Sequence, residues 1–349
     1  MGSQRGYEGG AARSIIIGGA CSMASGARTR LWARLDAEAH EETHVAMLKE
    51  SMLFLARQDA IRHMAQTNPI GQRVARRFVA GETLDLAIQV AHTLNHQRIS
   101  VSLDHLGENT SDQREACAAA DDYVSIVERI HTEGVEGNVS VKLTALGLDI
   151  SEQLCRENLT RVLTCAQRYS MFVRVDMEGS EYTQRTVDLV CDMHHTFENV
   201  GTVMQTALFR TPDDVERLLS ERVRMRLVKG AYLEPPSLAY ERKSDVDSAY
   251  QRLLLPLLER GVYPAIATHD ERMINAAIRI AHERDIPRAR FEFQMLYGIR
   301  RDLQERLSTA GYNVRVYIPY GSQWYPYLTR RMAERPANLM FILSNALRG

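Results

Sequence analysis

The sequence predicts an α/β protein with a distorted (β/α)8 barrel, also called a TIM barrel, and two observations support this prediction. Eight short runs of β-forming residues occur after residue 98, and a helical stretch follows each of them. Polar residues also lie at or near the end of each run, as expected where the carboxyl ends of barrel strands gather around a site. A doubly wound sheet is the alternative for such alternation, but no GxGxxG segment follows the first run.

Composition places the chain among ordinary globular proteins. Of its 349 residues, 45% are hydrophobic and 25% are charged, and the net charge is -1. This charge gives no reason to expect nucleic acid or an anionic membrane as the main partner. The five cysteines form no CxxC pair, which indicates a reducing compartment and argues against a structural metal or a disulfide framework. No apolar run is long enough to span a membrane.

The first 97 residues precede the barrel. Residues 1–34 are rich in Gly, Ser, Ala and Arg, with Glu8 as their only acid, and we expect a disordered extension there. A targeting peptide is the alternative, because residues 13–21 resemble a signal segment and the Arg-rich, acid-poor balance resembles a transit peptide. Residues 35–97 should form helices, since apolar residues recur at the helical period from 35 to 66 and again after Gly81.

Residues 98–349 should form the catalytic barrel. Ser151 before Glu152 predicts a helix start after the second run. Thr211 before Pro212 predicts another after the fourth run, with a capping hydroxyl and a proline at the first helical position. The predicted strands are 99–103, 139–143, 172–176, 201–205, 223–228, 263–268, 290–295 and 314–318.

Three cations lie at the ends of these strands. Lys142 belongs to the second run, Arg226 belongs to the fifth, and Lys229 directly follows the fifth. Directed toward one barrel mouth, they would repel each other unless an anion or several carboxylates shared the site. A bound pyrophosphate would supply such an anion.

The last helix carries a second charged pattern. Tyr327, Arg330, Arg331 and Glu334 are spaced i, i+3, i+4 and i+7, so they share one helix face. Paired guanidinium groups suit a small carboxylate, because each offers a planar fork of donors at any physiological pH. A solvated face, with one arginine paired to Glu334, is the alternative.

Several segments together resemble the proline dehydrogenase family, especially its short single-function bacterial members. The resemblance runs from about residue 77 to 347. It is carried by residues 78–82 (FVAGE), 103–108 (LDHLGE), 226–232 (RLVKGAY), 267–270 (ATHD), 291–298 (FEFQMLYG) and 327–331 (YLTRR). The family's fold implies a distorted barrel whose eighth helix lies over the carboxyl ends of the strands.

The resemblance also implies roles for individual residues. Arg330 and Arg331 match the pair that holds the proline carboxylate, and Glu334 matches the acid that steadies them. Arg226 matches the residue near flavin N5, where it would stabilise negative charge on the reduced ring. The family's lysine near the start of the barrel has no evident counterpart. The remaining substrate-side matches are Asp104, Tyr232, Leu296, Tyr317 and Tyr327, and the remaining FAD-side matches are Gln205, Lys229, Gly230, Ala231, Thr268, His269 and Gln294.

The implied activity is the first step of proline catabolism. L-proline would be oxidised to 1-pyrroline-5-carboxylate by hydride transfer to N5 of FAD, with the electrons passing to a membrane quinone. A separate pyrroline-carboxylate dehydrogenase would take the product, and the protein would be cytoplasmic or peripheral at the membrane through its quinone. The alternatives are a flavin barrel acting on hydroxyproline or a folate, and a barrel that binds FAD without turnover. Tyr317 argues against hydroxyproline, because related hydroxyproline enzymes tend to lack this tyrosine.

Overall fold

The computed structural model describes residues 75–108 and 110–334, and these form a closed parallel barrel. Its eight strands pair in chain order, and β8 closes the ring by pairing with β1. Each strand overlaps one of the predicted runs, so the barrel is confirmed and the doubly wound sheet is excluded. The strands are β1 (Ser100–His105), β2 (Gly137–Val141), β3 (Val173–Val175), β4 (Val200–Gln205), β5 (Arg224–Val228), β6 (Ala265–Ala267), β7 (Glu292–Leu296) and β8 (Asn313–Tyr320).

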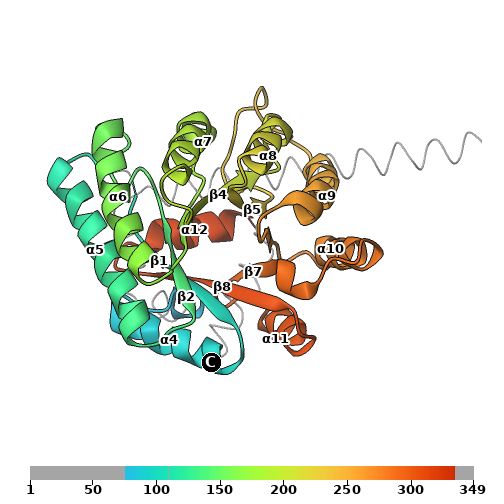
Figure 1. Cartoon of the computed structure of the whole chain (residues 1–349), viewed down its shortest axis with the longest axis horizontal. Helices are drawn as coiled ribbons and strands as arrows, with labels where there is room; N and C mark the ends of the chain where they lie inside the picture. Colours follow the sequence, from blue (N-terminus) through green and yellow to red (C-terminus); the bar gives the residue numbers. More distant parts are fainter. Residues whose placement is uncertain (1–74, 109, 335–349) are drawn as a thin grey trace, which may run out of the picture. The chain divides into compact units, whose positions relative to one another are not determined.

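A helix follows every strand, and seven of these helices surround the barrel (Figure 1). A short 3-10 turn, η1 (Arg288–Arg290), also precedes β7. The helices are α5 (Gln113–Thr132), α6 (Glu152–Arg168), α7 (Ser180–His194), α8 (Thr211–Ser220), α9 (Lys243–Arg260), α10 (Glu271–Glu283), α11 (Arg301–Thr309) and α12 (Trp324–Glu334). The predicted extension 1–34 and the helical stretch 35–66 lie outside the described residues.

The eighth barrel helix, α12, does not join the outer ring. Helix α4 (Leu84–His96), the helix predicted after Gly81, packs against both β1 and β8 and so occupies the outer position beside them. Figure 1 shows α12 (red) inside the ring of helices, across the barrel. Its residues Trp324 and Leu328 belong to one buried cluster with Leu106, which directly follows β1. Helix α12 therefore covers the carboxyl ends of the strands, as predicted.

The two predicted helix starts differ in outcome. Ser151 caps α6, and its hydroxyl accepts a hydrogen bond from the Leu154 amide at 3.4 Å. Thr211 does not cap α8: the cap is Arg210, and Thr211 is the first helical residue. The Thr211 hydroxyl instead donates to the backbone carbonyl of Gln205 at 2.5 Å. The capping prediction for Thr211 was wrong because the Gln205 carbonyl, at the end of β4, takes its hydroxyl.

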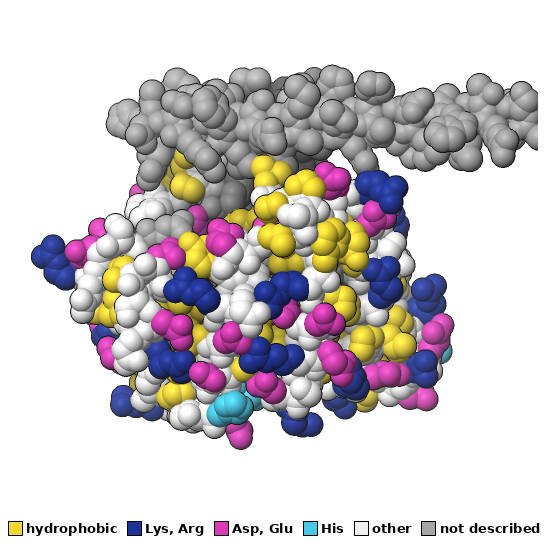
Figure 2. Space-filling model, turned by 90° about the horizontal axis from the view of Figure 1, so that it is seen from above, with side chains coloured by type: hydrophobic (Ala, Val, Ile, Leu, Met, Phe, Trp, Pro, Cys, Tyr) yellow, Lys and Arg dark blue, Asp and Glu magenta, His cyan; other side chains and the backbone are white. Residues whose placement is uncertain are grey.

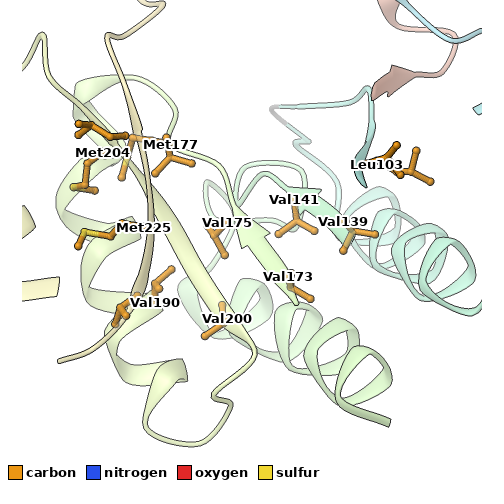
Figure 3. Packing of buried hydrophobic residues seen from close by; sticks show 14 of the residues in the cluster. Leu103, Val139, Val141, Val173, Val175, Met177, Val190, Val200, Met204 and Met225 are labelled. Atoms are coloured by element: carbon orange, nitrogen blue, oxygen red, sulfur yellow. The ribbon is translucent and has the colours of Figure 1, made fainter. Parts of the chain in front are cut away.

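Strand side chains divide between two environments. Alternate residues point outward and fill the space between sheet and helices, as Figure 3 shows for Val139 and Val141 of β2 and for Val173 and Val175 of β3. This outer layer is the main apolar core. On the face shown in Figure 2, positive and negative side chains are interspersed over the described surface.

The inward-pointing residues are unusually polar for a parallel barrel, whose interior is ordinarily filled by branched aliphatic side chains. Charged or polar side chains enter from seven of the eight strands, and β6 contributes only alanines. The buried polar members include Ser102, Asp104, Asn138, Ser140, Arg174, Gln205, Arg226, Glu292 and Gln294. The barrel interior therefore contains a hydrogen-bonded network that extends from the mouth toward the amino ends of the strands.

Candidate active site

The centre of the barrel mouth holds four balanced charges. Lys142, which follows β2, donates from Nζ to Oδ1 of Asp104 on β1 at 2.8 Å, and both side chains are buried. Arg226 on β5 donates from Nη1 to Oδ1 of Asp176 at 2.8 Å. Burial alone would lower the pKa of Lys142, but the charges of Asp104 and Asp176 raise it well above its usual value. Lys142 therefore stays protonated, and each of the two cations is paired with a carboxylate.

Arg226 is fixed on three sides. Besides its contact with Asp176, it donates from Nη2 to the Ser140 hydroxyl at 3.2 Å and from Nε to Oε1 of Gln294 at 2.5 Å. The Tyr317 hydroxyl donates to Oδ2 of Asp176 at 2.7 Å, and the Arg226 guanidinium lies 5.4 Å from the centre of the Tyr317 ring. Burial and the nearby carboxylates raise the pKa of Tyr317 well above its usual value, so the phenol remains a donor. The sequence-based matches Asp104, Arg226, Gln294 and Tyr317 thus converge.

The third predicted cation lies at the rim. Lys229 follows β5 and contacts two carboxylates, Oδ1 of Asp247 at 2.5 Å and Oδ2 of Asp270 at 2.8 Å. The three cations were expected to share the site with either a bound anion or several carboxylates. Among the described residues, carboxylates pair with all three. The three cations alone therefore do not require a pyrophosphate.

The other matches on the flavin side lie around the same rim. Gln205, at the end of β4, donates from Nε2 to the Glu178 carbonyl at 2.9 Å. The Thr268 hydroxyl accepts from the Asp270 amide at 3.1 Å, and Nε2 of His269 accepts from the Leu296 amide at 3.0 Å. Because Nε2 accepts, this contact places the imidazole proton on Nδ1.

The loop after β5 contains an exposed glycine, Gly230. Gly230 has φ +119°, a conformation that side-chain-bearing residues rarely adopt, and a Cβ there would lie 3.1 Å from Cβ of Ala207. Ala231 and Tyr232 follow it and are half-buried. The absence of a side chain at Gly230 therefore follows from its backbone conformation and from the nearby Ala207.

Helix α12 supplies the remaining candidates. Tyr327 is buried in the same cluster as Phe78 and Leu106. Arg330, Arg331 and Glu334 belong to α12, but their side chains lie outside the description. Leu296 ends β7 and is half-buried.

Asp176 and Ser140 were given no role from the sequence, and Lys142 was predicted only as one of three cations at the barrel mouth. They are nevertheless as central as Arg226, since each lies within hydrogen-bond distance of a matched residue. The alternation of Asn138, Ser140 and Lys142 along β2 was the available signal, because residues two apart on a strand face the same side.

Comparisons with known proteins agree with this architecture. The family model described as proline dehydrogenase matches residues 87–343. Proline dehydrogenase 2 of Bacillus subtilis is 40% identical over 294 residues, 84% of this chain and 96% of that protein. Proline dehydrogenase of Deinococcus radiodurans is 39% identical over 308 residues, 87% of this chain and 99% of that protein.

A solved structure gives the same result for the fold. Proline utilization A from Bdellovibrio bacteriovorus, inactivated by N-propargylglycine, matches with a TM-score of 0.72 and 27% identity over 76% of this chain. The match spans 33% of that longer protein. On the family model and the near-complete coverage of the single-function relatives, the chain belongs to the proline dehydrogenase family.

Proposed function

We propose that the protein oxidises L-proline to 1-pyrroline-5-carboxylate with FAD as its bound redox cofactor. The observation that carries this proposal is the Arg226 guanidinium, held at the barrel mouth by Asp176, Ser140 and Gln294 in a chain of this family. FAD, when bound, supplies the hydride acceptor, a redox function that no amino-acid side chain offers. The work left to the protein is binding, orientation and electrostatics.

The rim residues suit a flavin nucleotide. Gly230 is exposed on this rim and lies beside Gln205, since a Cβ built on it would be 3.5 Å from Oε1 of Gln205. Arg226, Lys229 and the Gln205 amide are donors, and flavin and phosphate oxygens need donors. We assign Gln205, Arg226, Lys229, Gly230, Ala231, Thr268, His269 and Gln294 to the FAD side.

The substrate carboxylate needs cations beyond Lys142 and Arg226, because each of these is already paired with a carboxylate. Arg330 and Arg331 on α12, which covers the mouth, are positioned along the chain to supply them, with Glu334 one turn further on. We assign Asp104, Tyr232, Leu296, Tyr317 and Tyr327 to the walls and support of the substrate pocket. Fixing the carboxylate and the ring would orient the carbon next to the ring nitrogen for hydride loss.

Tyr317 favours proline over hydroxyproline. Its hydroxyl is held by Asp176 and its ring packs near Arg226, so the phenol is not free to withdraw. The electrons would pass to a membrane quinone and the product to a separate dehydrogenase. Within the described part of the chain, no helix has the length and apolarity needed to cross a bilayer.

The test is an anaerobic titration of purified full-length protein with L-proline, followed by the visible absorption of the flavin. Proline should bleach the flavin without added oxidant, and hydroxyproline should do so much more slowly. Protein that binds flavin but is not bleached by proline would contradict the proposed activity. Protein that binds no flavin would contradict the proposed cofactor.

A further inference from the structure

A second charged layer lies in the barrel interior, below the mouth. Glu292 is the first residue of β7 and is only 2% exposed. Both of its carboxylate oxygens lie 3.1 Å from Nε of Arg315 on β8, and Arg315 donates from Nη1 to the Val101 carbonyl at 2.7 Å. Burial alone would raise the pKa of Glu292, but Arg315 and a hydrogen bond from Gln294 outweigh it and hold the pKa below its usual value. The carboxylate is therefore ionised.

Gln294 connects this layer to the mouth. Residues 292 and 294 are two apart on β7, so their side chains point into the barrel together, while Phe293 between them is buried in the outer core. The Gln294 amide donates from Nε2 to Oε1 of Glu292 and accepts at Oε1 from Nε of Arg226. One side chain thus touches both charged layers.

The two neighbours of Gln294 leave its amide only one favourable orientation. A guanidinium has donors and no acceptor, so only the amide oxygen can face Arg226. An ionised carboxylate has acceptors and no donor, so only the amide nitrogen can face Glu292. The charge on Glu292 therefore opposes a flip of the amide that would set its N–H groups against Arg226.

We propose that Glu292 is a positioning residue for the reaction, acting through Gln294 to hold the Arg226 guanidinium in its orientation at the mouth. The inference rests on the proposed function, in which Arg226 stabilises negative charge on reduced flavin. Its rival is a purely structural role, in which Glu292 only offsets the charges of Arg174, Arg224 and Arg315. The two roles differ in what a neutral isostere does to folded, flavin-loaded protein.

The test is Glu292→Gln in the full-length flavoprotein. The limiting rate of flavin reduction should fall at least about tenfold, as for loss of a hydrogen bond to a charged group, while the dissociation constant for proline stays within about twofold of the parent value. The flavin reduction potential should fall by up to about 30 mV, the two-electron equivalent of tenfold. Asp214→Asn is the matched control, because Asp214 is also buried and paired, with Arg210 at 2.7 Å, but lies on α8 outside the barrel.

A double-mutant cycle decides whether Glu292 acts through Gln294. Gln294→Met should by itself slow reduction about tenfold, and adding Glu292→Gln should then change the rate by less than about twofold. Multiplicative losses, near a hundredfold, would refute action through Gln294. A Glu292→Gln protein with the parent's rate and potential would refute the positioning role altogether.

Loss of the Glu292 charge leaves Arg315 unpaired, so the single variant can lose stability. Glu292→Gln combined with Arg315→Gln removes both charges together and should show the same fall in rate and potential; parent values in this protein would also overturn the inference. The potential is measured without proline. A parent that proline does not bleach would refute the proposed function, while the potentials would still decide the role of Glu292.

Discussion

Replacing Arg226 with methionine should lower both the stability of the fold and the reduction potential of the bound flavin. The side chain is buried and paired with Asp176, and removal of one partner of a buried ion pair costs about 3–5 kcal/mol. Asp176 keeps the hydrogen bond from Tyr317, which places the expected loss at the lower end of this range. The lost contact with reduced flavin, about 1.5–3 kcal/mol for a hydrogen bond to a charged group, corresponds to a potential lower by roughly 30–65 mV.

The assay is a potentiometric titration of the purified, flavin-loaded variant, with urea unfolding measured in parallel. Arg226→Lys is the control, because it keeps the positive charge but loses the fork that contacts Asp176, Ser140 and Gln294 together. It should retain most of the potential and lose part of the rate. An unchanged potential in folded Arg226→Met protein would return Arg226 to a purely structural role.

Four further predictions follow from the site and its surroundings. Arg330→Met and Arg331→Met should each retain flavin but raise the KM for proline at least about tenfold, since each removes a charge-assisted contact worth roughly 1.5–3 kcal/mol. If both variants kept the KM and kcat of the parent, the assignment of these arginines to the proline carboxylate would be refuted. Hydrogen bonds from Arg272 and Lys229 hold the pKa of Asp270 below its usual value of 3.8, so its ionisation stabilises the fold above about pH 4 and this contribution is lost as the pH falls through the folded-state pKa. Asp270→Asn can still cap α10. It should reduce the loss of stability at acid pH, measured by urea unfolding at several pH values. A pH dependence equal to that of the parent would show that Asp270 is not its source. Burial raises the pKa of Cys155 and of Cys191 to about 12, so a thiol reagent at neutral pH should label the more accessible Cys117 before either of them, as mass spectrometry of the labelled protein can check. Deletion of residues 1–34 should leave proline-dependent bleaching intact, and an aggregated or flavin-free product would show that this segment is needed.

The sequence predicted the barrel because the fold depends on a repeated local pattern. Each strand alternates between outward apolar and inward side chains, and each is followed by a helix, so eight repeats are visible without knowledge of any contact. The strand ends also indicated where chemistry gathers, since parallel strands place their carboxyl ends on one face. Asp104, Arg226, Gln294 and Tyr317 could be found in this way.

Tertiary structure decided which charges meet. Lys142 and Asp104 are 38 residues apart, and Arg226 and Asp176 are 50 apart, so no local spacing reveals either pair. Thr211 failed as a cap for a local reason, because α8 begins at Thr211 itself and its hydroxyl donates to the Gln205 carbonyl at the end of β4. Separation along the chain also explains why Glu292 was given no role from the sequence: Gln294, its neighbour on β7, reaches Arg226 on β5 only because both strands flank β6 in the barrel. The hydrophobic periodicity of the sequence determines where helices and strands form. The partners of buried charges depend on which strands the barrel brings together.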